Sequence, residues 1–461
     1  MEIFGQTLII INLIFIITFF FVIAVRLTQM LVTSYKNGKD RRQRYIADLK
    51  GYMGMENIIP VSVILPVYNK ENIIVDSIKS LLALDYDNKE IIVVNDGSTD
   101  NTHLHIINHF ALEEIEYSVK RSVSTKNIQR VYYNAQYPAL IYVVKRNGGI
   151  ADSINCGINV SQCPAFMCVE PGVHIDKDTL LKLSFEFFKD SSVTAASGII
   201  RPGIGFDATV TEKGVKKTGF AAAMQAVECT RLSSYRLTSD AYHSLFTEYG
   251  PFMLLFKQSV ANSGGYRIDT DGTFYDMMIK IRQSLSKNKR KYVESIKSSI
   301  VYRPASIDSV GELLNRHIYC QVGIIDALCA SWKSLFNFKN HGFFGVFWLP
   351  YQWISNVLFV LLEGVSYITI PLAVAFGFMT HGQALYFIAA YMLLHIFVSL
   401  SGMVVDQQTG GNVVSPKSCK VAFMYCVIEV LGYHQLTVLN RCMGIMNYLT
   451  YKRLYKKKHK L

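Results

Sequence analysis

The chain has one long apolar stretch near its start and three more in its last third. Leu8–Val25 holds 18 residues without a charge, enough for a helix to cross a hydrocarbon layer of about 30 Å. It follows Glu2, precedes a basic cluster and lacks a small-residue cleavage site, so we expect a retained anchor and not a signal peptide. The other apolar stretches are Phe343–Met379, Ala384–Val405 and Val421–Leu449.

The three later stretches differ in how cleanly they could span a membrane. Phe343–Met379 is too long for one crossing and contains prolines, which predicts an interfacial helix around 343–355 and a crossing near 356–379. Ala384–Val405 predicts a return span after a tight turn at Thr380–Gln383. Val421–Leu449 contains Glu429, His434 and Arg441, which predicts a broken or partly interfacial helix.

Between these stretches, short apolar runs alternate with helical periodicity. Val61–Leu65 and Glu90–Val94 read as strands, and apolar residues recur at helical spacing across Asn72–Leu84 between them. The same alternation continues with a strand at Leu140–Val144, a helix at Ile150–Val160 and a strand at Ala165–Val169. This order predicts an α/β domain with a mostly parallel sheet covered by helices.

Composition and charge support a membrane protein. Of the 461 residues, 50% are hydrophobic and only 18% are charged, below the share of about 25% in soluble domains. Most of the net charge of +12 lies in residues 33–50 and 451–461, which flank apolar segments. The positive-inside rule and attraction to anionic lipid explain such clusters better than nucleic-acid binding, which needs a recognisable module.

The charge distribution also predicts an orientation. We expect an N-terminus outside the cell, with the α/β domain and the C-terminus in the cytosol of a multi-pass cell-membrane protein. A cytosolic C-terminus requires an even number of crossings after the domain, two or four. The nine scattered cysteines lack a CxxC pair, which is typical of reduced thiols facing the cytosol.

Two predicted strands end in residues suited to nucleotide recognition. The first ends at Pro66 and is followed by Tyr68, and the second is followed by Asp96, Gly97 and Ser98. A carboxylate at such a position accepts hydrogen bonds from a base or ribose, and glycine permits close backbone approach. Asp-Gly-Ser alone is as typical of a turn, but the pairing with the preceding strand end favours a site.

Several motifs in order resemble those of the membrane-embedded family 2 glycosyltransferases, which include processive polysaccharide synthases. They are ILPVYNKE, VVNDGSTDNT, RNGGIADSINCGI, QAVECTR, GPFMLLFK and GGYRIDTDG, and the likeness extends over about 60–450. The resemblance implies a GT-A nucleotide-sugar domain (Rossmann-like sheet) on membrane helices, a UDP-sugar donor, Mg²⁺ or Mn²⁺, and inversion at the anomeric carbon. The nucleotide-binding residues it implies are Pro66, Tyr68, Asp96, Gly97, Ser98 and Asp152.

The residues that would perform the transfer depart from the family pattern. The metal-binding Asp-x-Asp is replaced by Glu170-Pro171-Gly172, which leaves Glu170 as a weak metal ligand. The Glu-Asp pair that supplies the base falls on Thr273 and Phe274. Asp271 and Asp276 are the nearby substitutes, although Asp271 also suits a helix cap and Asp276 a solvated helix face.

Two further departures are the lysine of GGKAD, which is Ile150 here, and the QRxRW motif, which falls on Arg316–Cys320. We also interpret Gln225, Glu228 and Arg231 as an exposed helical ion-pair set. Asp96, Asp152 and Glu170 could equally be turn and cap residues with no role in binding.

Three hypotheses follow. The first is an active glycosyltransferase that uses Glu170 with Asp271 or Asp276. The second, which we favour, is a catalytically degenerate subunit of polysaccharide synthesis that pairs with an active relative or senses nucleotide. The third is a membrane protein without a ligand. The predicted division is 1–32 anchor, 33–52 basic linker, 53–335 GT-A-like domain, 336–450 interfacial and transmembrane helices, and 451–461 basic tail.

Overall fold

The computed structural model describes most of the chain in two compact units. The described residues are 2–37, 51–52, 58–201, 209–211, 214–216, 219–242, 252–287, 294–303, 307, 309–408 and 419–458. One unit is built on a β-sheet, and the other contains the long helices together with the short strands β9 (Thr209–Thr211) and β10 (Gly214–Lys216). Most of the basic linker predicted at 33–52, and the side chains of the basic tail at 451–461, lie outside the described residues.

The sheet unit contains a ten-stranded mixed sheet with a parallel centre. The strand order is β3-β4-β5-β2-β1-β6-β11-β8-β12-β7, and β5, β2, β1 and β6 run parallel to one another. The central strands are β1 (Val61–Val67), β2 (Lys89–Asn95), β5 (Leu140–Lys145) and β6 (Ala165–Cys168). The flanking strands are β3 (Glu113–Ile115), β4 (Ile128–Tyr133), β11 (Met253–Phe256), β8 (Ala195–Ile200), β12 (Glu294–Arg303) and β7 (His174–Ile175).

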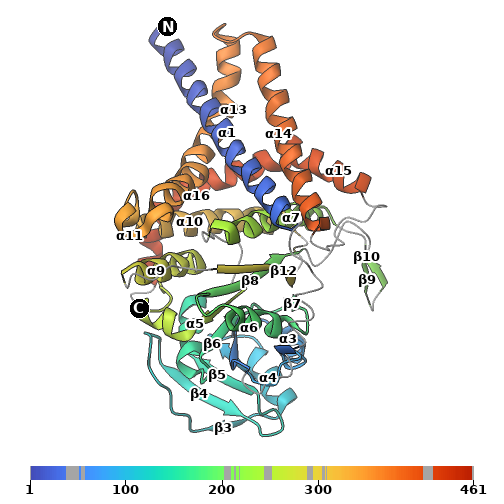
Figure 1. Cartoon of the computed structure of the whole chain (residues 1–461), viewed down its shortest axis with the longest axis vertical. Helices are drawn as coiled ribbons and strands as arrows, with labels where there is room; N and C mark the ends of the chain where they lie inside the picture. The colour runs from blue at the N-terminus through green and yellow to red at the C-terminus, as the bar shows by residue number, and fades with distance from the viewer. Residues whose placement is uncertain are drawn as a thin grey trace. The chain divides into compact units, whose positions relative to one another are not determined.

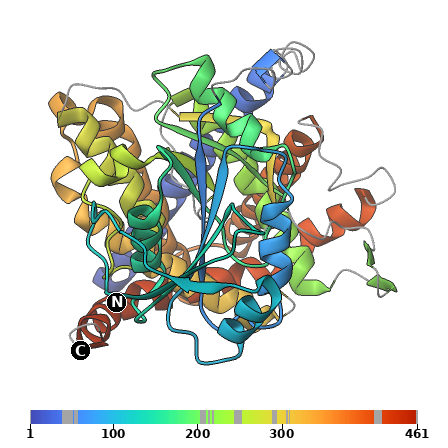
Figure 2. The ribbon, with the colours of Figure 1, turned by 90° about the horizontal axis from the view of Figure 1, so that it is seen from below.

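Helices lie on both sides of the central strands (Figure 2). They are α3 (Ile74–Leu82), α4 (Thr102–Phe110), α5 (Ile150–Val160), α6 (Thr179–Lys189), α8 (Lys257–Asn262) and α9 (Thr273–Lys287). Every residue of β1 is buried, as the uninterrupted apolar run predicted for a strand covered on both faces. Gly157 brings α5 close to this strand, since a Cβ there would lie 2.5 Å from Ile64 Cγ2. The predicted α/β class and its six predicted elements are confirmed. The prediction of a mostly parallel sheet is wrong, because β3, β4, β11 and β7 each pair antiparallel with their neighbours.

Three long helices of the other unit run alongside one another (Figure 1). They are α1 (Glu2–Asn37), α13 (Phe359–Ala375) and α14 (His381–Gln408). Their shared core is aromatic: Phe15 stacks on Phe359 at 6.0 Å between ring centroids, and Phe19 contacts Tyr391 at 5.4 Å. Aromatic pairs of this kind add to the packing that holds helices together where lipid removes the hydrophobic drive.

The apolar stretch that begins at Phe343 is one nearly continuous helical path into α13. It consists of α11 (Phe338–Phe343), η2 (Phe344–Trp348), α12 (Leu349–Trp353), η3 (Ile354–Leu358) and α13. The π-helical segments η2 and η3 lie on either side of Pro350, where wider turns accommodate a residue that cannot donate a backbone hydrogen bond.

The turn predicted at Thr380–Gln383 is wrong by a few residues. The chain turns at Phe376–Met379, with Gly377 at a φ of 73°, and α14 begins at His381. Thr380 and Gln383 form a reciprocal capping box, in which each backbone N–H is bonded by the other side chain at 3.0 and 3.2 Å. Polar residues that read as a loop are therefore the helix start.

A second set of helices runs across the first in Figure 1. It comprises α7 (Phe220–Tyr242), α10 (Val310–Ala330), α15 (Cys419–Ile428), η4 (Glu429–Tyr433) and α16 (His434–Lys458). The short 3₁₀ helix η1 (Trp332–Ser334) follows α10. The break predicted in Val421–Leu449 is not found: the chain stays helical from α15 into α16, and the π-helical segment η4, which begins at the buried Glu429, lies between them.

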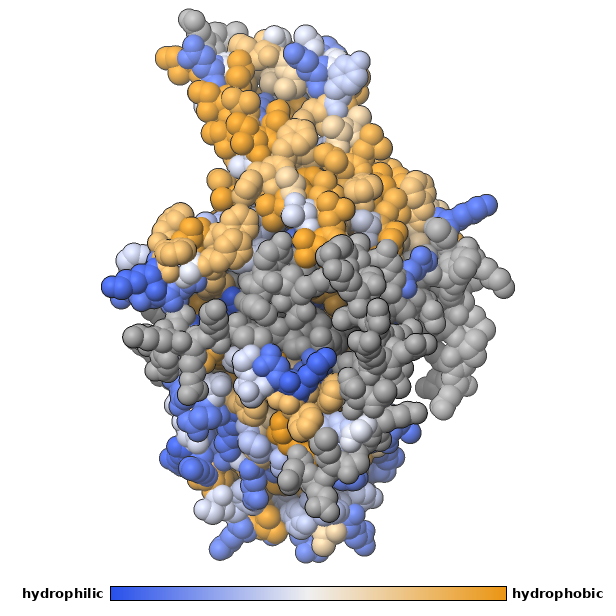
Figure 3. Space-filling view, viewed as in Figure 1, coloured by the Kyte–Doolittle hydropathy of each residue, from blue (hydrophilic) through white to orange (hydrophobic). Residues whose placement is uncertain are grey.

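Four helical segments are long and apolar enough to cross a membrane: Ile3–Val32, Phe338–Ala375, His381–Val405 and Lys420–Tyr448. Large apolar side chains such as Ile10, Ile17, Ile368 and Leu393 are more than half exposed on the first three. Figure 3 shows apolar side chains gathered over the region of α1, α13 and α14. An exposed apolar surface of this extent is typical of contact with lipid.

Candidate functional site

The carboxyl ends of four parallel strands meet at one edge of the sheet. The chain passes from β1 to β2 and β5 on one side, then crosses to β6 on the other side of β1. Open α/β sheets bind ligands at such a reversal, because the loops on either side of it diverge and leave a crevice. Every residue predicted for nucleotide binding lies in these loops, at a strand end or in the helix that follows one.

The loops after β1 and β2 are joined by hydrogen bonds. Asn69, at a positive φ of 51°, donates its backbone N–H to Ser98 Oγ at 3.1 Å, and its side-chain oxygen accepts from Thr99 N at 2.8 Å. The backbone N–H of Glu71 donates to Asp100 at 3.2 Å. Burial slightly opposes ionisation of Asp100, but hydrogen bonds from Thr102 and Glu71 outweigh it and lower its pKa. The residues of the predicted Asp-Gly-Ser turn thus hold the loop after β2 against the loop after β1.

Pro66 and Tyr68 differ in how they could meet a ligand. Pro66 is buried in β1, so it shapes the strand end, whereas Tyr68 is half exposed at the start of the loop. Gly97 has a φ of 70°, and a Cβ there would lie 3.2 Å from the backbone nitrogen of Asn147. Glycine is therefore required at position 97 for both the turn and the approach of the β5 loop.

Asp96 lies at the centre of this edge and is almost fully buried. One of its oxygens is 2.5 Å from Lys145 Nζ and 2.9 Å from Gly148 N, and the other accepts from Gly149 N at 2.7 Å. A carboxylate offers about four acceptor positions, of which three are used. Asp96 thus fastens the loop after β5 and keeps one acceptor position.

Asp152 shares the same lysine. Its Oδ2 is 2.5 Å from Lys145 Nζ, and its Oδ1 accepts from the backbone nitrogen of Lys126 at 2.9 Å. Lys145 is completely buried, so two carboxylates compensate one ammonium inside the protein. Burial raises the pKa of the nearby Cys156 thiol to about 12, with Lys145 opposing the shift and Asp152 and Asp96 adding to it.

Lys145 belongs to this site although the sequence did not predict it there. The available signal was a lysine that ends an otherwise apolar strand, LIYVVK, three residues before Gly148. A cation at a strand end, beside two acidic residues assigned to binding, suggests a compensating charge. In the structure it brings Asp96 and Asp152 together.

The loop after β6 carries Glu170, which is half-buried. Gly172 turns the chain at a φ of 83°, and its backbone N–H donates to Ser77 Oγ at 2.9 Å. His174 is exposed and lies in the short edge strand β7, paired with Arg303 of β12. Glu170 is therefore the one acidic residue in the turn that directly follows β6.

The two acidic residues near α9 lie in different surroundings. Asp271 is exposed and precedes Gly272, whose carbonyl accepts from Asp276 N, so Gly272 and not Asp271 occupies the cap position. Asp276 is buried, with its oxygens 3.4 Å from Arg267 Nε and 3.2 Å from Lys280 Nζ. The prediction of a solvated helix face for Asp276 is wrong, because the Arg267 and Lys280 cations compensate its burial.

Residues 62–260 match the model of glycosyl transferase family 2. The chain carries a family 2 glycosyltransferase domain. It is 24% identical over 322 residues to the poly-beta-1,6-N-acetyl-D-glucosamine synthase of Staphylococcus aureus strain MSSA476, covering 70% of this chain and 68% of that protein. The synthase of the same name from Staphylococcus epidermidis is 25% identical over 232 residues, covering 50% and 47%.

The fold of this chain has a solved counterpart. The mannosyltransferase PcManGT of Pyrobaculum calidifontis, solved with GDP-Man and Mn²⁺, superposes with a TM-score of 0.52 at 13% identity. The alignment covers 89% of this chain and 99% of that one. The predicted GT-A class, with apolar helices compatible with membrane spans, is confirmed.

At this sheet edge, the described residues supply only part of the ligand set for the divalent metal that the family implies. Mg²⁺ at such sites is held by one or two carboxylates together with substrate phosphates and waters. Of the two motif positions only Glu170 offers a carboxylate here, because the second is Gly172. Within the described part of the chain, no three acidic, histidine or cysteine ligand atoms converge at this sheet edge. Asp96 and Asp152 do converge, but on the ammonium of Lys145.

The position of the acceptor base is also altered in this domain. Thr273 is buried and its hydroxyl bonds to the carbonyl of Thr270, and Phe274 has no titratable group. Of the two substitutes, Asp276 is buried and held in two ion pairs, whereas Asp271 is exposed to solvent. An acceptor hydroxyl needs a base within hydrogen-bond reach, so Asp271 is the stronger candidate.

The polar set on α7 corrects a further prediction. Gln225 and Glu228 are buried, and Arg231 pairs with Glu429 at 2.6 Å instead of forming an exposed pair on its own helix. Glu228 lies 3.0 Å from both Tyr433 Oη and His317 Nε2, and His317 belongs to the segment aligned with QRxRW. These residues connect α7, α10 and the η4 segment within the helical unit.

Proposed function

We propose that the chain is a membrane-embedded subunit of cell-surface polysaccharide synthesis that binds a nucleotide or UDP-sugar without transferring the sugar efficiently. The loops after β1, β2 and β5, which hydrogen bonds hold together, are called the nucleotide frame below. The observation that carries this proposal is that this frame lies at one sheet edge with a single carboxylate, Glu170, directly after β6. The frame and the transfer chemistry are separable, because they depend on different residues.

The ordered loops support nucleotide binding. Asp96 keeps one acceptor position after its three hydrogen bonds, which suits the N–H of a base. Tyr68 offers an exposed ring at the same edge, and Ser98 is held in place by Asn69. The frame is preorganised, so little conformational entropy would be lost on binding.

The altered positions support weak or absent transfer. Loss of a positioned base removes a factor of about 10²–10⁴ in rate. Loss of the metal clamp on a diphosphate leaving group removes several kcal/mol of transition-state stabilisation. Gly172 stands at the metal position and has no side-chain ligand atom, and Thr273 and Phe274 stand at the base positions and have no carboxylate to accept the proton.

The relatives and the helices support the biological setting. The relatives are polysaccharide synthases by name, and this chain has four helices apolar enough to span a membrane. We infer a cytosolic sheet domain and C-terminus and an external N-terminus from the basic segments 33–52 and 451–461. An active family 2 glycosyltransferase is the partner we propose for a non-catalytic subunit.

The test measures binding and turnover on the same preparation. The full chain in detergent is titrated with UDP and UDP-N-acetylglucosamine by calorimetry, then incubated with Mg²⁺ or Mn²⁺ and assayed for released UDP. We expect saturable binding that weakens in Tyr68→Ala, with UDP release at the rate of buffer alone. Turnover that is lost in Asp271→Asn would contradict the proposal, and so would the absence of any nucleotide binding.

An active inverting glycosyltransferase is the second candidate. The exposed carboxylate of Asp271, directly before α9, is the observation that favours it. In that case Glu170 would bind the metal and Asp271 would accept the proton of the acceptor. Asp87→Asn, which removes an exposed carboxylate just before β2, serves as the control in the turnover assay.

A further inference from the structure

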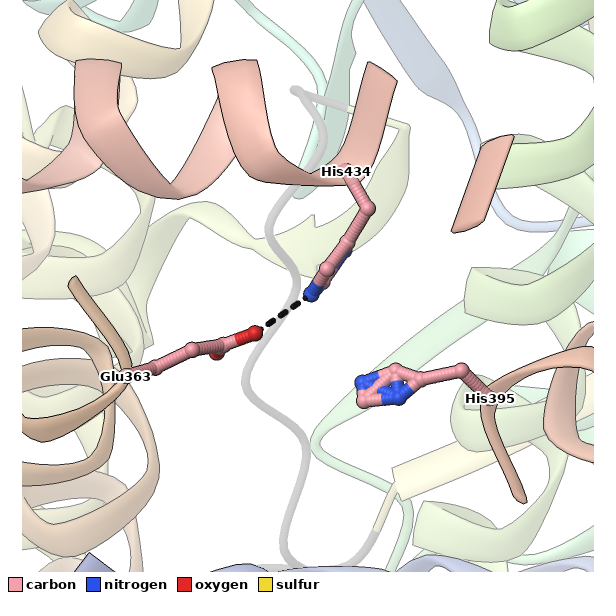
Figure 4. Close-up of side chains that lie close together, drawn as sticks. All are labelled: Glu363, His395 and His434. Atoms are coloured by element: carbon pink, nitrogen blue, oxygen red, sulfur yellow. Dashed lines mark hydrogen bonds and ion pairs between the residues drawn. The ribbon is translucent and has the colours of Figure 1, made fainter. Parts of the chain in front are cut away.

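Three potential metal ligands meet in the helical unit, outside the glycosyltransferase domain. Glu363 comes from α13, His395 from α14 and His434 from the start of α16. One ligand atom from each lies within 4.8 Å of the other two, and His434 Nε2 is 2.8 Å from Glu363 Oε1. Figure 4 shows the three side chains converging from separate helices.

His395 has no hydrogen-bond partner for either ring nitrogen within the described residues, although its side chain is only 7% exposed. Its ring points toward Glu363 and His434 (Figure 4). Buried polar atoms in native structures nearly always have a hydrogen-bond partner. The two ring nitrogens of His395 have none among the described residues, although the ring faces a carboxylate and a second imidazole. A ligand between the three side chains would supply it.

The surroundings hold the three groups in place. Tyr391 donates its hydroxyl to Glu363, and Tyr367 donates to the same carboxylate oxygen at 3.3 Å. His395 stacks on Phe19 with ring centroids 5.8 Å apart, and on Tyr391 at 4.5 Å. Outer hydrogen bonds that orient a carboxylate, and an apolar shell that excludes water, are common features of metal sites.

The ligand chemistry distinguishes among cations. Two imidazoles and one carboxylate suit Zn²⁺ and neighbouring transition metals, whereas Mg²⁺ and Ca²⁺ favour sets made of oxygen. Tetrahedral zinc with bonds of about 2.0–2.1 Å places its ligand atoms about 3.3 Å apart. Ligand atoms spread over at most 4.8 Å reach that spacing by small side-chain rotations.

We propose that Glu363, His395 and His434 bind one transition-metal ion, with Zn²⁺ the best fit, and that the ion ties α13, α14 and α16 together. The ligands come from three separate helices, of which α13 and α14 are joined by a short turn and α16 follows later in the chain, so a shared ion would restrain their packing as a cross-link does. Three protein ligands leave a fourth position for water or another small ligand. The proposal does not depend on whether the sheet domain binds nucleotide or transfers sugar.

The test uses the full chain purified in detergent without chelator. Metal content is measured by inductively coupled plasma mass spectrometry, before and after treatment with a chelator and reloading with Zn²⁺ or Co²⁺. We expect about one Zn²⁺ per chain, and a visible Co²⁺ spectrum of the intense tetrahedral type after reloading. A wild-type chain that takes up neither ion overturns the proposal.

Matched variants separate binding at the cluster from adventitious binding. His395→Phe keeps a ring against Phe19 and Tyr391, so the fold survives while the ligand is lost. His381→Ala, at an exposed position on the same helix, is the control. We expect uptake to fall at least tenfold in His395→Phe and in Glu363→Gln and to stay unchanged in His381→Ala. Equal uptake in all of them overturns the assignment, with a monodisperse elution profile as the check of folding.

Discussion

Two buried polar clusters in this chain satisfy their charges in opposite ways. At the sheet edge, Lys145 is held by Asp96 and Asp152, and backbone N–H groups occupy most of the remaining acceptor positions. In the helical unit, Glu363 and His434 pair while His395 keeps two unsatisfied nitrogens. The residues of the first cluster compensate one another's charges, whereas the second leaves the two His395 nitrogens without a partner among the described residues.

The difference matters because burial penalises an uncompensated polar group in both places. Where the chain supplies its own counter-charge, the cluster maintains structure, as Lys145 does for the nucleotide loops. Where it does not, a ligand is the simplest source of compensation.

Removing the internal cation should have the largest effect. Lys145→Met leaves two buried carboxylates without their partner, and breaking a buried ion pair in this way costs about 3–5 kcal/mol. Thermal unfolding of the full chain should show a midpoint about 10 °C lower. Lys120→Met, at an exposed position, should change stability by less than about 0.5 kcal/mol. Equal stability of Lys145→Met and wild type would show that the cluster of Lys145, Asp96 and Asp152 does not stabilise the fold.

The incomplete cluster should respond to metal where the complete one does not. Zn²⁺ at about 100 times its Kd should stabilise the chelator-treated chain by about 2.7 kcal/mol. Without metal, His395→Phe should be as stable as wild type or more stable, because it removes two unsatisfied nitrogens. Thermal unfolding with and without Zn²⁺ checks both statements. A large loss of stability in metal-free His395→Phe would show that the imidazole is already satisfied.

The two aspartates beside α9 should separate stability from activity. Asp276→Asn leaves Arg267 and Lys280 without their shared carboxylate, which should lower stability by about 1–3 kcal/mol. Asp271→Asn, at an exposed position, should stay within about 0.5 kcal/mol of wild type. Denaturant unfolding measures both variants. The reverse ranking would mean that the ion pairs of Asp276 do not form in solution.

The smallest expected effect is a pH dependence beside the nucleotide frame. Burial, and to a lesser extent the charge of Arg130, lowers the pKa of His103, whose Nδ1 lies 2.9 Å from Tyr142 Oη. The unfolded chain then binds the proton more readily, so stability should fall as the pH drops below about 6.5. The loss should stay below about 1 kcal/mol because solvent screens a half-buried group. Unfolding curves of wild type and His103→Gln should diverge between pH 7.5 and 5.5, and parallel curves would refute this.

The fold was largely predictable because its signals are local. Uninterrupted apolar runs such as Val61–Leu65 specify strands buried on both faces, and 18 uncharged residues specify an anchor helix. The capping box at Thr380 and Gln383 was read as a turn, since both structures use the same polar residues. The reciprocal hydrogen bonds between side chain and backbone distinguish a helix start from a turn, and a hydropathy pattern does not contain that information.

The buried polar contacts were harder to predict because they depend on residues distant in sequence. Arg231 meets Glu429, and His395 meets Glu363 and His434, only after several helices have packed. Periodicity placed Asp276 on a helix but did not reveal that Arg267 would join it from the preceding loop. By contrast, the loop positions of Asp96 and Asp152 followed from strand ends, which are visible in the sequence.

The effect of Mn²⁺ on UDP affinity tests the central claim most directly. Calorimetry on the full chain, with Mn²⁺ and then with chelator, reports whether the sheet edge can hold a metal against a diphosphate. The account predicts that UDP binds and that its Kd changes less than twofold between the two conditions, since Gly172 offers no second carboxylate. A Kd at least tenfold lower with Mn²⁺, lost in Glu170→Gln, would contradict it and restore a working metal site.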